Sequence, residues 1–176
     1  MKKQLIALAT VGAVLAGCSS SATAAQIQVP QAIVKTNPDF MSIVMQDAAE
    51  QRIAGVVKQL KKRVGRTWYV FSGSTPAGWD CSGLTRWAYG ELGVDIPHSA
   101  NKQARLGQRV KTPQVGDLVL FGYHSSNIFF HASIYIGNNK VIHAGFKKGQ
   151  TTSVLDLSAA SVKNTKIRFV RLDLNG

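Results

Sequence analysis

The sequence predicts an α+β domain in which helices come first and an antiparallel sheet follows. Apolar residues recur at three- and four-residue spacing over residues 40–64 and 81–92, which is typical of amphipathic helices. After residue 116 the pattern changes to short runs rich in Val, Ile, Leu and Phe, which are typical of buried strands. Helical segments followed by consecutive strands indicate an α+β fold.

The helices are predicted from their apolar faces and their ends. The face of the first helix consists of Ile53, Val56, Val57, Leu60 and Val64. Its other face carries several Lys and Arg residues, which favour a solvated surface, with contact to an anionic wall or lipid as the alternative. The second helix follows the turn-forming run 72–79, and Ser99 can cap a short helix over residues 100–106.

The sequence after residue 116 predicts a sheet. Residues 66–71, which come before the helix at 81–92, are expected to be extended, and a short helix is expected at 158–162 between the last two strands. Strands are expected at 117–121, 131–136, 140–144, 152–155 and 167–172.

The second and third of these strands form a hairpin around Asn138-Asn139, because Gly and Asn tolerate positive φ at such turns. A turn centred there pairs residues whose numbers sum to about 277. His131 and His143 are then offset by about three residue steps, or roughly 10 Å along the ladder. A simple two-strand register therefore does not predict contact between them.

The amino-terminal sequence narrows the choice of partners. The formal net charge of +12 favours binding to a polyanion, and the candidates are nucleic acid, anionic lipid and a bacterial cell wall. Lys2 and Lys3 precede an apolar run at 5–14 that is too short to span a bilayer comfortably. Leu15-Ala16-Gly17-Cys18 then resembles a bacterial lipoprotein signal whose cysteine carries lipid, and an ordinary secretory peptide is the alternative. Both interpretations export the protein, so nucleic acid is not expected as a partner.

Three regions follow from this interpretation. They are a lipoprotein signal peptide at 1–17, a flexible tether at 18–40 and a catalytic domain at 41–176. A lipid at Cys18 would anchor the protein to a membrane of the cell envelope, facing the periplasm. Resemblance to Gram-negative lipoproteins favours the outer membrane, because no acidic residue follows Cys18 directly. No feature of the sequence identifies a protein adaptor.

Cys81 is the candidate nucleophile. Cys18 and Cys81 are the two cysteines, and a lipidated Cys18 cannot form a disulfide, so Cys81 would be an unpaired thiol in an oxidising compartment. Its place at a helix start, next to unpaired backbone N–H groups, favours the thiolate. A buried, inert cysteine is the alternative.

A cysteine nucleophile needs a base, and the base needs a third group to orient its ring. The four histidines are His98, His124, His131 and His143, of which His124 lies in a loop and is interpreted as solvated. The histidines lack tight metal-site spacing, and neither a CxxC pair nor a Gly-rich phosphate loop occurs. We therefore expect neither a metal nor an organic cofactor.

Several motifs together resemble the NlpC/P60 family of bacterial cell-wall cysteine peptidases, which have a papain-like core. They occur in the family's order between about Ile53 and Leu172. The motifs are Trp68-Tyr69-Val70, Asp80-Cys81-Ser82-Gly83-Leu84, Gly116-Asp117-Leu118-Val119-Leu120-Phe121, His131 with Ile134-Tyr135-Ile136-Gly137, and Val141-Ile142-His143-Ala144.

The resemblance implies a role for each matching residue. Cys81 matches the nucleophile, His131 the general base and His143 the residue that orients the base. Tyr69 matches a tyrosine near the oxyanion, whose stabilisation by N–H and O–H donors is a large part of acyl-transfer catalysis.

Four further residues have open roles. Asp80 and Ser82 match the motif mainly as a turn-and-cap pair, with substrate contact as the alternative. The family often has Arg-Thr or Arg-Ser where this chain has His98-Ser99. Recognition of a stem-peptide carboxylate, a pH-sensitive contact and no role at all are therefore alternatives for His98.

The resemblance implies a peptidoglycan endopeptidase that hydrolyses amide bonds of stem peptides or cross-links by a Cys-His-His thiol mechanism. A non-catalytic wall-binding lipoprotein on the same fold is one alternative. An amidase or transacylase with another substrate is a second, since a fold does not fix a substrate.

Overall fold

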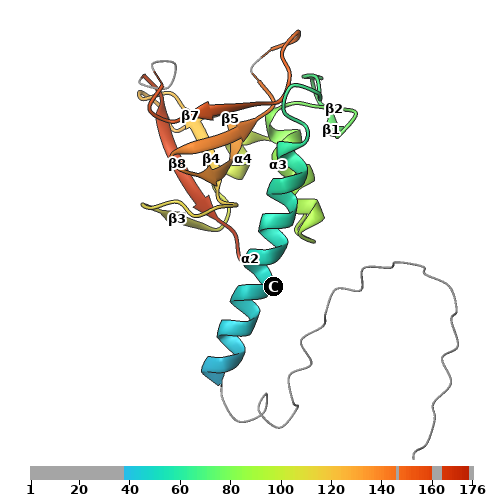
Figure 1. The fold of residues 1–176 in the computed structure, drawn as a ribbon. Helices are drawn as coiled ribbons and strands as arrows, with labels where there is room; N and C mark the ends of the chain where they lie inside the picture. Colours follow the sequence, from blue (N-terminus) through green and yellow to red (C-terminus); the bar gives the residue numbers. More distant parts are fainter. Residues whose placement is uncertain (1–37, 146, 160–163, 175–176) are drawn as a thin grey trace, which may run out of the picture. The chain divides into compact units, whose positions relative to one another are not determined.

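The computed structural model describes residues 38–145, 147–159 and 164–174. The predicted signal peptide, the predicted lipidation site Cys18 and most of the predicted tether lie outside these ranges. The described part is α+β, with helices α3 (Cys81–Glu91) and α4 (Ala100–Gln103) on an antiparallel sheet and helix α2 (Pro38–Lys61) against α3 (Figure 1). The predicted fold class is confirmed.

Helix α2 (Pro38–Lys61) begins and ends slightly earlier than the sequence pattern predicts. Val56, Val57 and Leu60 of its C-terminal half are buried in the core. Val64, predicted on the same face, is 37% exposed, because the helix has ended and residues 62–66 form turns. Among the helices of the described residues, none has the length and apolar character needed to cross a membrane.

Helices α3 (Cys81–Glu91) and α4 (Ala100–Gln103) both begin at capping side chains. The Asp80 carboxylate accepts a hydrogen bond from the Gly83 N–H, and the Ser99 hydroxyl accepts one from the Lys102 N–H. These are N-caps, which satisfy backbone donors that the first helical turn leaves unpaired. Both predicted caps are confirmed, whereas α4 is shorter than the predicted helix at 100–106.

The main sheet has six antiparallel strands. Their order is β3 (Gln108–Val110), β8 (Lys166–Arg171), β4 (Leu118–Gly122), β5 (Phe129–Gly137), β6 (Lys140–His143) and β7 (Ser153–Asp156). The five predicted strands are all present, with ends that differ by one or two residues. Sequence reasoning missed β3 and the small hairpin of β1 (Ser74–Thr75) and β2 (Gly78–Trp79), which lies inside the predicted turn.

Two other expectations differ from the structure. The predicted extended run at 66–71 makes isolated bridges at Trp68 and Tyr69 and no strand of its own. The predicted helix at 158–162 cannot be compared in full, because residues 160–163 lie outside the described residues, and Ser158 itself is in a turn.

The register between β5 and β6 corrects the predicted separation of the two histidines. At the tip, Gly137 pairs with Lys140 around Asn138 and Asn139, whose φ values of 51° and 58° match the predicted turn. A bulge between Tyr135 and Gly137 then shifts the pairing by one residue, so that Ile134 faces Ile142. Because side chains alternate between faces, a one-residue shift moves a side chain to the other face. His131 and His143 therefore lie on one face as diagonal neighbours, and the predicted three-step offset is wrong.

The sheet separates two apolar clusters. Strand β4 contributes Leu118 and Leu120 to the larger cluster under the helices, and Val119 and Phe121 to a smaller cluster on the other face. This period-2 alternation is that of a strand buried on both faces. The helices thus hold one face of β4 and β5, and Phe121 of the smaller cluster packs against the His131 ring.

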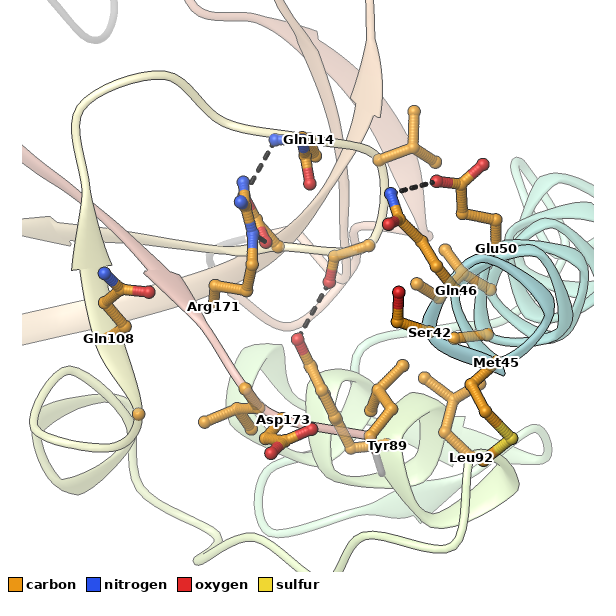
Figure 2. A pocket seen from close by; sticks show the side chains of 18 residues that line it. Ser42, Met45, Gln46, Glu50, Tyr89, Leu92, Gln108, Gln114, Arg171 and Asp173 are labelled. Carbon is orange, nitrogen blue, oxygen red and sulfur yellow. Dashed lines mark hydrogen bonds and ion pairs between the residues drawn. The ribbon is translucent and has the colours of Figure 1, made fainter. Parts of the chain in front are cut away.

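A cavity of about 710 Å³ lies between α2, α3, the segment before β4 and the end of β8 (Figure 2). At its wall the Tyr89 hydroxyl donates to the Gly116 carbonyl, and Arg171 forms a two-pronged ion pair with Asp117 at 2.9 and 2.8 Å. Asp117 is buried and also accepts from the Gln114 N–H. Asp117 therefore ties the end of β8 to the turn before β4. None of the residues lining this cavity lines the cleft at Cys81.

Candidate active site

Cys81 is the first residue of α3 and lines a cleft of about 430 Å³. Five other predicted site residues line the same cleft, namely Tyr69, Asp80, Ser82, His98 and Ser99. The two remaining predicted residues, His131 and His143, do not line it and are buried. The structure therefore gathers six of the eight predicted site residues around one opening.

The Asp80 carboxylate holds the loop and the helix start together. One oxygen accepts from the Gly83 N–H at 2.7 Å and from the Ser82 hydroxyl at 3.1 Å, and the other accepts from the Ser72 N–H at 3.0 Å. His98 Nε2 lies 2.9 Å from the first of these oxygens. The His98 side chain is 21% exposed, so it contacts Asp80 while facing the cleft.

Gly83 is required by the close approach of the preceding loop. A Cβ atom at this position would lie 1.9 Å from the Gly73 carbonyl oxygen. The same carbonyl accepts a hydrogen bond from the Asp80 N–H. The glycine after Cys81-Ser82 thus lets the loop pack directly on the helix start, which fixes the position of Cys81.

The pKa of the Cys81 thiol is raised, contrary to the sequence-based expectation. Burial is the main cause, and hydrogen bonding by the backbone of Ala132 is the largest effect in the opposite direction. The Asp80 carboxylate also raises the pKa, while the backbone N–H groups of Ser82 and Cys81 lower it. The helix start thus stabilises the thiolate as expected, but desolvation of the charge is the larger effect.

His131 and His143 form a buried hydrogen-bonded pair. His131 Nε2 lies 3.1 Å from His143 Nδ1, and the rings meet edge to face. Burial, followed by the nearby His143, lowers the pKa of His131 to about 3, and burial lowers the pKa of His143 to about 4. Both rings are therefore neutral at pH 7, which leaves His131 able to accept a proton.

Ser153 extends this pair and was not found from the sequence. Strand β7 pairs Ser153 with His143, and the Ser153 hydroxyl oxygen lies 3.0 Å from His143 Nε2. If His143 Nε2–H donates to Ser153, then His143 Nδ1 accepts from His131 Nε2–H. His131 Nδ1, the ring nitrogen that does not contact His143, then carries a lone pair. No motif marks Ser153, because the contact arises from the pairing of two strands.

Tyr69 faces the cleft from the segment before β1. Burial raises the pKa of its phenol, and the charges of Cys81 and Asp80 raise it further. Tyr69 lines the same cleft as both of these groups. A protonated Tyr69 hydroxyl can donate a hydrogen bond into the cleft at neutral pH.

No group of three or more His, Cys, Asp or Glu side chains suited to a metal ion occurs among the described residues.

Comparison with known proteins places this geometry in a family. The model of the NlpC/P60 family matches residues 65–171, which is more than half of the chain. The chain belongs to the NlpC/P60 family. The match includes Tyr69, Cys81, His131 and His143.

Individual NlpC/P60 relatives agree with this assignment. Murein DD-endopeptidase MepS/murein LD-carboxypeptidase of Escherichia coli is 30% identical over 156 residues, covering 83% of this chain and 80% of the relative. A probable endopeptidase of Mycobacterium tuberculosis is 36% identical over 106 residues, but the chain spans 26% of its length. The solved NlpC/p60 domain of the peptidoglycan hydrolase SagA is 29% identical with a TM-score of 0.56, covering 68% of this chain and 98% of that domain.

Proposed function

We propose that this protein is a cysteine peptidase that hydrolyses amide bonds in the stem peptides or cross-links of peptidoglycan. One observation carries the proposal. Helix α3, which begins with Cys81, packs on strand β5, which carries His131, one half of the buried histidine pair. A thiol beside a strand that carries an oriented imidazole is the arrangement that nucleophilic catalysis requires.

The reaction would proceed in two balanced steps. His131 takes the thiol proton as the Cys81 sulfur bonds to the scissile carbonyl carbon, and the same proton then passes to the leaving amine as the C–N bond breaks. In the second step water gives a proton to His131 and its oxygen to the thioester, and the sulfur leaves with that proton. His143 orients His131 throughout.

The oxyanion formed in each step needs donors in the cleft. We assign this role to the Tyr69 hydroxyl and to the backbone N–H groups of Cys81 and Ser82, since these N–H groups already lower the thiol pKa. We assign contact with the bound peptide to His98 and Ser99, which line the cleft beside Cys81. The Asp80 carboxylate and the Ser82 hydroxyl would act mainly by holding the loop and the helix start together.

The proposed substrate rests on the relatives. They include a murein DD-endopeptidase and the NlpC/p60 domain of a peptidoglycan hydrolase, and the chain aligns with 80% of the first and 98% of that domain. We further propose that Cys18 carries a lipid and anchors the protein in the cell envelope, facing the periplasm from the outer membrane. Without residues 1–17, which hold Lys2 and Lys3, the chain has 19 Lys and Arg against 9 Asp and Glu, and this net charge of +10 suits residence beside an anionic wall.

The test is release of soluble fragments from purified sacculi. The native chain is expected to release muropeptides, and Cys81→Ala is expected to release none while keeping the melting temperature of the native chain. Cys81→Ser is the matched control for size and polarity, and it is expected to lose at least a hundredfold in rate. Release by Cys81→Ala at the native rate would refute the thiol mechanism, and binding without release by the native chain would favour a wall-binding protein.

A further inference from the structure

A second groove lies beside His143, apart from the cleft at Cys81. Its volume is about 550 Å³, and His143 and Ser153 contribute to its wall. Trp68 and Val154 also line it and are 58% and 44% exposed. An indole exposed to this extent in a groove offers a large flat apolar surface with a polar N–H at its edge.

The groove and the cleft lie on either side of one chain segment. Trp68 lines the groove, whereas its neighbour Tyr69 lines the cleft. The Tyr69 N–H donates to the Gln150 carbonyl at 2.8 Å, and Trp68 bridges to Thr151, so this segment runs beside residues 150–152. A polymer longer than the cleft can therefore cross this segment and reach the groove.

Basic residues from two distant parts of the sequence lie on turns that adjoin the groove. The Gly65 N–H donates to the Thr152 carbonyl, and the Thr152 N–H donates to the Thr67 carbonyl, both at 2.8 Å. These bonds bring the turn after α2 beside the turn at residues 147–150. We call the exposed cations of the two turns the basic rim, and they are Lys61, Lys62, Arg63, Arg66, Lys147 and Lys148.

The basic rim has no neutralising acid near it in sequence. Neither residues 51–79 nor residues 118–155 contain an Asp or Glu. Within the described residues, none of the six rim side chains takes part in an ion pair. Six exposed cations on two adjoining turns, none of them in an ion pair, produce a positive potential that attracts an anionic ligand.

We propose that this groove is a second substrate-contact site, which holds a carboxylate-bearing part of the peptidoglycan polymer next to the bond being cut. Trp68 would stack on an apolar sugar or peptide face, and the basic rim would attract stem-peptide carboxylates. The proposal rests on the proposed function, since it needs a polymer with one part in the cleft. Its contribution is to binding and orientation of the polymer, because the reacting atoms lie in the cleft.

The test is co-sedimentation of the full chain with purified sacculi, with Cys81→Ala in every variant so that no fragment is released. The rim variant carries Lys62→Gln, Lys147→Gln and Lys148→Gln. The matched control removes three exposed cations elsewhere, through Arg109→Gln, Lys111→Gln and Lys140→Gln. Both variants lose the same net charge, so a difference between them reports the position of the charge.

The rim variant is expected to bind sacculi about tenfold more weakly at low salt, since three exposed charge contacts are lost. Its affinity is also expected to depend less on salt than that of the control. Trp68→Ala is expected to weaken binding several-fold at high salt, where charge contacts are screened. Equal losses in the rim variant and the control would overturn the proposal.

A parallel arm with phosphatidylglycerol vesicles separates the wall from a lipid surface. A rim variant that loses vesicle binding and keeps sacculus binding would show that a membrane is the partner, which also overturns the proposal. Failure of the proposed function would appear separately, as no fragment release from sacculi by the chain with its native Cys81. Melting temperatures of all variants show whether each remains folded.

Discussion

Acidification between pH 7 and pH 5 is expected to destabilise the domain through its buried histidine pair. The ordinary pKa of histidine is 6.5, and in the folded protein it is lowered to about 3 for His131 and about 4 for His143. The unfolded chain therefore binds more protons than the folded one below pH 6.5, so the free energy of unfolding falls with pH. At pH 5 each histidine contributes a loss of about 2 kcal/mol, from 1.5 pH units at 1.36 kcal/mol per unit.

The two losses together are about 4 kcal/mol, a large part of the 5–15 kcal/mol by which domains are stable. The measurement is urea unfolding of the native chain and of a His131→Gln/His143→Gln variant at both pH values. Glutamine keeps hydrogen-bonding groups at these positions but does not titrate. The variant is expected to lose about 4 kcal/mol less than the native chain on acidification. An equal loss in both proteins would mean that the histidines are not held neutral by burial, and the proton-transfer argument would then be wrong.

Two further substitutions test the residues that hold His143 and Cys81 in position. Ser153→Ala is expected to lower kcat about tenfold with little change in KM, because His143 loses the acceptor that selects its tautomer. Ser153→Thr keeps the hydroxyl and is expected to restore most of the rate, whereas equal rates in all three proteins would rule out a positioning role. Gly83→Ala is expected to lower both the melting temperature and activity on sacculi, because its Cβ would overlap the Gly73 carbonyl oxygen. Gly90→Ala is the matched control in the same helix, since its Cβ meets nothing within 4 Å and helix propensity favours it; a melting temperature for Gly83→Ala as high as that of this control would refute the argument.

The sequence was sufficient to predict features that depend on local chemistry. Ser99 was expected to cap a helix because it precedes a helical pattern, Asp80 was interpreted as part of a turn-and-cap pair in the motif around Cys81, and both cap a helix. Asn138 and Asn139 were expected at a hairpin turn because they tolerate positive φ, and both have it.

Features that depend on pairing between distant segments were not predictable in the same way. The bulge before Gly137 adds one residue to β5, and no local propensity fixes its position. That single residue decides whether His131 and His143 share a face of the sheet. Ser153 reaches His143 only because β7 joins the edge of the sheet in one particular register.

The pKa values of the site residues also depend on how deeply each side chain is buried, and local sequence patterns do not predict that burial. At the helix start, burial outweighs the backbone donors and raises the pKa of the Cys81 thiol, while burial also lowers the pKa of His131. Both shifts favour the uncharged pair of thiol and imidazole over the thiolate–imidazolium pair. The proposed peptidase would therefore rest uncharged, and the proton would move only when the bound substrate supplies an oxyanion for Tyr69 and the helix N–H groups to stabilise. A resting thiol of this kind is also less readily oxidised than a thiolate, which suits the proposed location in the cell envelope.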